Sequence, residues 1–362
     1  MMAAAAVLCC VASSDGRTAG QSPPNEGCTS LGRIAAATPV EGVPPYAHII
    51  VIVDENKGYR RLIETGQAPH LAAFAKAYGR ATRFYAEAHP SEPNYVALIG
   101  GDTLGIRDDD PFYCEPGRRG PGCRSHERGY VRHSTACPHL GDELTAIHKR
   151  WKGYFQDLPS GRHPARYGAP AFAAAYDTGL YVPRHTGFLN FRSVWAGATA
   201  APPQFGDFDQ LDADLKSGTL PDFALVIPNM CDDMHGKVGV GIPADCLRMN
   251  TSGLIRRGDR ALARLVSKIQ ASSLWSAPQN AAIVITFDED EGEAMRGPAG
   301  FQGGRIPTVV ITNHGGAKPP DDTLYNHYAL LRTIEDALGV PQHLSHAGDP
   351  NIRPMVPLFA AD

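Results

Sequence analysis

Three runs of apolar, mostly β-branched residues set the strongest limit on the fold of this chain. They lie at 48–53, 223–227 and 281–287 and contain few polar residues. Such runs are typical of central strands that are covered on both faces, as in parallel sheets. Because segments with helical spacing alternate with them, the chain is expected to form an α/β fold with a largely parallel central sheet flanked by helices.

Apolar spacing, together with Gly and Pro, predicts the other elements. Further strands are expected over 82–86, 152–156 and 307–312. Helices are expected over 67–79 with Gly79 as the C-cap, 93–100 with Pro93 in the first turn, 139–150, 258–272 and 327–338. The stretches 100–135 and 160–220 show no clear period and are expected to lie over the active face.

The two ends of the chain differ from its centre. The first 12 residues form the longest apolar run, which is too short to span a bilayer and resembles a signal segment, with a disordered N-terminus as the alternative. We therefore expect no transmembrane segment. The organisation predicted is a possible signal segment over 1–20, a linker or N-terminal arm over 21–45, one large domain over 46–345 and a C-terminal tail over 346–362.

Cysteine usage indicates an oxidising compartment. Six cysteines follow the first 20 residues, and they include no CxxC pair that would suggest a zinc ribbon or a redox dithiol. Cys114 and Cys123 bracket one loop, and Cys231 and Cys246 bracket another, so both pairs look like loop staples, although the sequence does not choose among the pairings. A secreted or periplasmic location is expected, with free thiols in a cytosolic protein as the alternative.

Charge argues against one class of partner. The chain has 34 basic and 38 acidic residues, which give a formal net charge of −4. A basic field that attracts nucleic acid is therefore absent, and no nucleic-acid partner is expected.

Polar side chains follow three of the expected strands at the point where each strand ends. Glu55 and Asn56 follow the first, the segment 228–235 follows the second, and Asp288 and Glu289 follow the third. Ligands in open α/β sheets lie beyond these carboxyl ends. Carboxylates gathered there repel one another unless a cation lies between them. Their oxygens are suitable ligands for Mg²⁺, Ca²⁺ or Mn²⁺, and the nearby histidines are also suitable ligands for Zn²⁺ or Fe. Ordinary solvated loops or helix caps are the alternative for each strand taken alone.

Ser91 and two histidines could carry phosphoryl chemistry. Ser91 lies between an expected strand and an expected helix, where free backbone N–H groups and the helix dipole favour an alkoxide. A metal ion there would lower the pKa of its hydroxyl further. The alternative is a simple turn or N-cap residue. His185 and His235 are candidate phosphate contacts or general acids, because imidazole donates a proton near neutral pH.

Eight segments of the chain, taken in order, resemble the bacterial phosphoesterase family, which holds acid phosphatases and phospholipases C. The likeness covers roughly 46–345 and is greatest to secreted acid phosphatases of the mycobacterial type, notably in the SEPNY segment at 91–95 and the DMH segment at 233–235. The matching segments are 48–59, 87–103, 139–159, 181–191, 221–236, 283–292, 305–312 and 325–341.

The resemblance implies an alkaline-phosphatase-like core with one metal-dependent site in a phosphoesterase domain over 46–345. It implies that Ser91 is the nucleophile and that His185 and His235 contact the phosphoryl group, while His89 has a less certain role. The metal ligands that it implies are Glu55, Asn56, Ser91, Asp288 and Glu289.

We therefore expect a secreted, metal-dependent acid phosphatase that hydrolyses phosphate monoesters through a phosphoserine. Its cofactor is expected to be one divalent ion, Mg, Ca, Mn or Zn, and its substrate a small phosphate ester or a phospholipid headgroup. A phospholipase C-type phosphodiesterase remains open, because leaving-group specificity lies in the loops. A non-catalytic secreted metal- or glycan-binding module is a further alternative, against which the intact set of five ligand residues argues.

Overall fold

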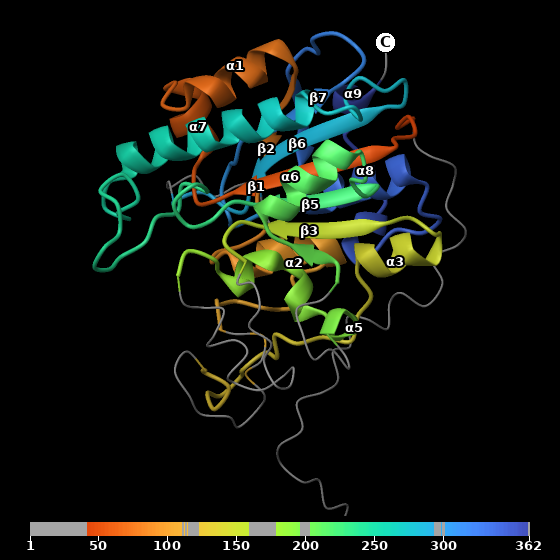
Figure 1. Ribbon diagram of the computed structural model, residues 1–362. Coiled ribbons are helices and arrows are strands. Elements are labelled where there is room, and N and C mark those ends of the chain that lie inside the picture. The colour runs from red at the N-terminus through yellow and green to blue at the C-terminus, as the bar shows by residue number, and fades with distance from the viewer. Residues whose placement is uncertain are drawn as a thin grey trace, which may run out of the picture.

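In the part of the chain that the structure describes, the strands form one eight-stranded mixed sheet in the order β4-β3-β5-β1-β6-β7-β2-β8 (Figure 1). The computed structural model describes residues 42–110, 112, 114, 123–158, 179–195, 203–292, 298 and 301–360. The signal segment expected over 1–20, and most of the arm expected over 21–45, lie outside these residues. The strands are β1 His48–Asp54, β2 Gly79–Phe84, β3 Trp151–Phe155, β4 Phe205–Gly206, β5 Phe223–Ile227, β6 Ala281–Phe287, β7 Thr308–Thr312 and β8 Asp321–Tyr325.

Helices cover both faces of this sheet. The contacts between helices group α1, α6 and α7 in one layer and α2, α3 and α8 in the other. The helices are α1 Pro69–Ala77, α2 Glu92–Gly100, α3 Leu140–Ala146, α5 Arg192–Trp195, α6 Phe208–Ser217, α7 Thr251–Gln270, α8 His327–Leu338 and α9 Val356–Phe359. A π-helical turn at Arg60–Glu64 and 3₁₀ turns at Pro183–Thr186, Phe188–Asn190 and Ser345–Gly348 complete the described elements.

The expected largely parallel α/β sheet is confirmed, with one strand reversed. Strands β1, β5 and β6 pair in parallel at the centre, as do β3 with its two neighbours and β2 with β8. Strand β7 runs antiparallel to both β6 and β2. Every residue of β5 and β6 is buried, which explains their continuous apolar sequences.

Several expected boundaries are wrong. Helix α1 ends at Ala77, and Gly79 is the first residue of β2 rather than the C-cap, so β2 begins three residues before the expected 82–86. Helix α3 stops at Ala146 rather than 150, and α7 begins at Thr251 rather than 258. The stretch 160–220 is partly outside the described residues, and its described part contains the unexpected helix α6.

Both loop staples are confirmed as disulfides, Cys114–Cys123 and Cys231–Cys246, and Cys137 is disulfide-bonded as well. At the C-terminal end, α9 packs on β2 and β7, and the Tyr46 hydroxyl donates to the carbonyl of Phe359 at 2.6 Å. Among the helices that the structure describes, none combines the length and the apolar character needed to cross a bilayer.

Candidate active site

The Ser91 hydroxyl lies at the centre of the residues predicted to bind a metal. Its Oγ is 3.3 Å from Glu55 Oε2, 3.2 Å from Glu289 Oε1 and 3.4 Å from Asn56 Nδ2. Asp288 joins them because its Oδ1 accepts the Asn56 backbone N–H at 2.8 Å. The structure therefore brings together five side chains from three distant segments of the sequence.

The register of β1 and β6 causes this meeting. The two strands pair in parallel up to Asp54 and Phe287, so residues 55–56 and 288–289 leave the sheet side by side. Asn56 then turns with a φ of 56°, a left-handed conformation that asparagine tolerates better than most residues. Its side-chain amide donates to Glu55 Oε2 at 2.6 Å, which fixes the two groups relative to each other.

Ser91 reaches the same point from the start of α2. It occupies the N-cap position of that helix, but its side chain makes no capping hydrogen bond, so the hydroxyl is directed to the carboxylates instead. Asn94 holds the preceding segment in place, because its Oδ1 accepts the N–H groups of Glu87 and Ala88 at 3.1 and 3.0 Å.

The carboxylates of the cluster are buried, and some of their oxygens accept no hydrogen bond from the described residues. Burial, reinforced by neighbouring carboxylates, raises the pKa of Glu55 well above its usual range and that of Glu289 to about 7. Burial also raises the pKa of Asp288. Among the described residues, Asp288 Oδ2 and Asp233 Oδ2 have no hydrogen-bond partner. Crowded carboxylate oxygens with free lone pairs are the ligands that a hard divalent cation prefers, so the residues fit such an ion.

Two aromatic side chains support Glu55 from the side away from Ser91. The Tyr95 hydroxyl donates to Glu55 Oε1 at 2.5 Å, and His185 Nδ1 lies 3.2 Å from the same oxygen. The two rings stack with their centroids 5.4 Å apart. Burial, helped by Arg184 and His235, lowers the pKa of His185 well below its usual range, so the ring is neutral.

His235 faces the site from the segment after β5. Its backbone N–H donates to Asp233 Oδ1 at 2.7 Å, and its Nδ1 lies 2.7 Å from the carbonyl of Gly236. Burial lowers the pKa of His235 to about 4, so this ring is also neutral near neutral pH. Its centroid lies 5.9 Å from that of His185.

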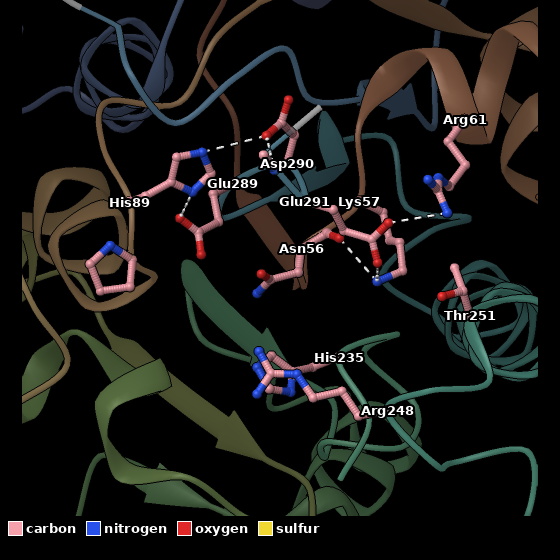
Figure 2. Close-up of a pocket in the computed structure, with 12 residues that line it drawn as sticks. Asn56, Lys57, Arg61, His89, His235, Arg248, Thr251, Glu289, Asp290 and Glu291 are labelled. Atoms are coloured by element: carbon pink, nitrogen blue, oxygen red, sulfur yellow. Dashed lines mark hydrogen bonds and ion pairs between the residues drawn. The ribbon is translucent and has the colours of Figure 1, made fainter. Parts of the chain in front are cut away.

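A cavity of about 710 Å³ opens beside this cluster (Figure 2). Glu289 and Asp290 line one wall, and His89 lies between them, with its Nδ1 bonded to Glu289 and its Nε2 3.4 Å from Asp290 Oδ1. These contacts with Asp290 and Glu289 raise the pKa of His89 to about 10, so it is charged. The basic residues Lys57, Arg61 and Arg248 also line the cavity and lie apart from His89 in Figure 2.

One of the basic groups is deeply buried. Lys57 is only 2% exposed, and its Nζ lies 2.6 Å from Glu291 Oε1 and donates to the carbonyl of Asn56 at 3.0 Å. Arg61 approaches the other oxygen of Glu291 at 3.2 Å. These contacts tie the residues that follow β1 to those that follow β6.

Sequence reasoning missed some of these residues. Tyr95 lies four residues after Ser91, so a helix that begins near Ser91 returns Tyr95 to the same face one turn later. Asp233 lies in the DMH segment, but nothing in the sequence sets its carboxylate apart from that of Asp232. His89 also had no assigned role, because histidine alone is a weak signal.

Comparisons with known proteins identify the family and support the fold. The model of the Phosphoesterase family matches residues 63–341. A phosphatidylinositol-3-phosphatase of Mycobacterium tuberculosis is 29% identical over 300 residues, which cover 83% of this chain and 79% of that protein. A phosphate-repressible acid phosphatase of Penicillium chrysogenum is 25% identical over 279 residues, which cover 75% of this chain and 55% of the fungal protein. The chain thus spans only about half the length of that fungal relative.

A solved structure supports the expected core. A protein of the alkaline phosphatase superfamily from Vibrio parahaemolyticus superposes with a TM-score of 0.53 at 14% identity, over 91% of this chain and 77% of that one. The expected family and the alkaline-phosphatase-like α/β core are therefore confirmed. The chain belongs to the Phosphoesterase family and is a hydrolase that acts on phosphoric ester bonds.

Proposed function

We propose that the chain is a secreted, metal-dependent acid phosphatase that hydrolyses phosphate monoesters through a phosphorylated Ser91. The observation that carries the proposal is the position of Ser91 Oγ, within 3.4 Å of Glu55, Asn56 and Glu289. The names of the relatives, two phosphatases, favour monoesters over the diesters of a phospholipase C. The disulfides are consistent with export to an oxidising compartment.

The proposed cofactor is one divalent cation, Mg, Ca, Mn or Zn. The residues that would hold it are Glu55, Asn56, Ser91, Asp288 and Glu289. When bound, such an ion lowers the pKa of a ligating hydroxyl and offsets the charge of a phosphoryl group. The free Oδ2 of Asp288 and the burial of the surrounding carboxylates support this assignment.

In the first step, Ser91 passes its proton to a neighbouring carboxylate and attacks phosphorus. The Oγ–P bond forms while the P–O bond to the alcohol breaks. The positive end of the α2 dipole lies at Ser91 and favours the phosphoryl group there. His89 is charged and lies on the cavity wall, so it can donate the proton that the leaving oxygen needs.

In the second step, water cleaves the phosphoserine. His235 is neutral, and because its Nδ1–H donates to Gly236, its Nε2 carries a free lone pair. It takes a proton from the water, whose oxygen attacks phosphorus as the bond to Ser91 Oγ breaks. Ser91 recovers its proton from the carboxylate that took it in the first step, inorganic phosphate leaves, and exchange with solvent removes the proton from His235 and restores the one that His89 gave up. His185 keeps Glu55 oriented through both steps.

Turnover of p-nitrophenyl phosphate by Ser91→Ala tests this proposal. We expect a loss of at least about a thousandfold in kcat, because the nucleophile is removed, with an unchanged unfolding temperature. Ser193→Ala is the matched control, since this exposed serine lies outside the site and its hydroxyl donates to Asp142 at 3.1 Å. Chelation should abolish wild-type activity, and a divalent ion should restore it. Turnover by Ser91→Ala close to that of the wild type would refute the nucleophile assignment.

A further inference from the structure

Exposed apolar side chains concentrate on one loop of the described structure. Five large hydrophobic residues are exposed in the described part of the chain, and four of them lie between residues 237 and 249, a segment that we call the apolar loop. Met249 is 92% exposed and Val240 107%, so these side chains are in almost full contact with water. The four are Val238, Val240, Leu247 and Met249.

The base of the apolar loop is firmly held. The Cys231–Cys246 disulfide closes it, and the Lys237 N–H donates to the carbonyl of Cys246 at 2.9 Å. Arg257 of α7 approaches Asp245 Oδ1 at 3.2 Å. These contacts fix the loop against the body of the protein at Lys237 and at 245–246, while Val238, Val240 and Met249 are exposed to water rather than packed on the core.

The apolar loop lies next to the cavity. It protrudes from the body of the molecule just before α7 begins, at the left of Figure 1. Arg248, within the loop, and His235, just before it, both line the cavity and lie close together in Figure 2. A surface that held the tip of the loop would therefore lie beside the entrance to the active site.

The charge of the apolar loop is positive. It carries Lys237 and Arg248, while its one acidic residue, Asp245, is paired with Arg257 of the body. Exposed apolar side chains flanked by cations are typical of segments that insert into the interface of a phospholipid bilayer, where the cations meet phosphate groups. A flat protein partner would instead favour a contiguous, partly buried patch.

We infer that the apolar loop inserts into the surface of a phospholipid bilayer and so presents the cavity to phosphate monoesters on lipid headgroups. The reaction at those headgroups rests on the proposed function, whereas the binding to the bilayer does not. The inference predicts that the protein binds phospholipid vesicles. It also predicts that the apolar loop raises the rate at which the protein cleaves a lipid phosphate monoester in a bilayer, but not its rate on soluble esters.

Co-sedimentation with vesicles tests the inference directly. The full chain is mixed with vesicles of phosphatidylcholine alone and with vesicles that also contain phosphatidylserine. The test variant combines Val238→Ser, Val240→Ser and Met249→Ser, none of which lines the cavity. The control is Leu324→Ser, because Leu324 is the remaining exposed large hydrophobic residue of the described structure and lies on β8, outside the apolar loop.

We expect the wild type and the control to bind vesicles, more strongly with phosphatidylserine and less at high salt. The triple variant should partition at least about tenfold less, because its insertion loses apolar area. Its kcat/KM on p-nitrophenyl phosphate should stay unchanged, while its rate on phosphatidic acid in vesicles should fall by a similar factor.

Two results would overturn the inference. One is a wild type that hydrolyses p-nitrophenyl phosphate but stays in the supernatant with both kinds of vesicle. The other is a triple variant that binds as well as the wild type, or that differs only by losing self-association in sedimentation velocity, which would assign the loop to a second copy of the chain. A wild type that binds vesicles but hydrolyses no phosphate monoester would instead contradict the proposed function.

Discussion

The Tyr95 hydroxyl donates to Glu55 Oε1 at 2.5 Å, while the other oxygen of this carboxylate lies 3.3 Å from Ser91 Oγ. The two oxygens of this carboxylate therefore have different partners. One is held by the helix that carries the nucleophile, and the other faces the nucleophile itself. Because Tyr95 lies one helical turn after Ser91 on α2, the orientation of Glu55 depends directly on the position of this helix.

Tyr95→Phe should weaken catalysis without unfolding the protein. The change removes one hydrogen bond to a fully buried carboxylate. A hydrogen bond to a charged partner contributes about 1.5–3 kcal/mol, so its loss should lower kcat/KM by about 10- to 100-fold. Tyr154→Phe is the matched control, because its hydroxyl bonds to Asp214 at 2.6 Å, outside the site. Steady-state kinetics on p-nitrophenyl phosphate measure the effect, and equal kinetics for the two variants would contradict the role of Tyr95.

His89→Gln should lower kcat most for esters with poor leaving groups. If His89 protonates the leaving oxygen, its loss should lower kcat by about 10²- to 10⁴-fold for an alkyl phosphate, whose alcohol needs a proton. The loss should be much smaller for p-nitrophenyl phosphate, whose phenolate leaves without one. His70→Gln on the exposed side of α1 is the control. An equal loss for both substrates would show that His89 acts by holding Glu289 and Asp290 alone.

A buried pair of carboxyl groups should make stability depend on pH. Glu143 of α3 interacts with Glu335 of α8, and burial raises the pKa of Glu143 to about 8 and that of Glu335 well above its usual range. In each group one oxygen, Oε2, is otherwise without a partner among the described residues. One proton shared between the two groups would satisfy both oxygens.

The sign of the effect follows from the raised pKa. Between about pH 4.5 and pH 8 the unfolded chain has lost the Glu143 proton while the folded chain keeps it, so the free energy of unfolding falls as pH rises. The expected slope from this one group is about 1.4 kcal/mol per pH unit in that window. In denaturant unfolding, the free energy of unfolding of Glu143→Gln should depend less steeply on pH than that of the wild type. For the surface variant Glu64→Gln, it should depend on pH as steeply as for the wild type. Parallel curves for all three proteins would contradict the shared proton.

The Cys231–Cys246 disulfide should stabilise the folded state. It closes a loop with a sequence separation of 15, for which the loss of chain entropy in the unfolded state predicts about 3 kcal/mol. The double variant Cys231→Ala/Cys246→Ala should therefore have a lower unfolding temperature in the absence of reductant. Reductant should lower the unfolding temperature of the wild type further than that of the variant. A variant as stable as the wild type under oxidising conditions would contradict this expectation.

The sequence predicted the central elements well, because their local signals agree with their surroundings. The boundaries of β5 and β6 match the apolar runs to the residue, since both strands are covered on each face. Helix α8 also matches, because the Asn326 side chain accepts the Ala329 N–H and Gly339 ends the helix with a φ of 76°. Where capping residues and burial favour the same conformation, the sequence pattern is enough to predict the element.

Peripheral elements escaped prediction for the opposite reason. Helix α6 buries only Leu211 and Leu215, so its apolar stripe is too narrow to recognise within a long polar stretch. Strand β8 is an edge strand with a mostly polar sequence, and its pairing with β2 decides its conformation. In the site, the sequence order of strands and polar residues allowed us to expect that residues 55–56 meet residues 288–289. The contact of Tyr95 could be predicted only with the exact start of α2.

Trapping the phosphorylated enzyme tests the central claim most directly. The full-length protein is mixed with a phosphate monoester, quenched in acid and digested, and its peptides are analysed by mass spectrometry. The account predicts one phosphoryl group on Ser91 of the wild type, and none in Ser91→Ala. Phosphate found on another residue, or turnover by Ser91→Ala with no phosphoserine formed, would contradict it.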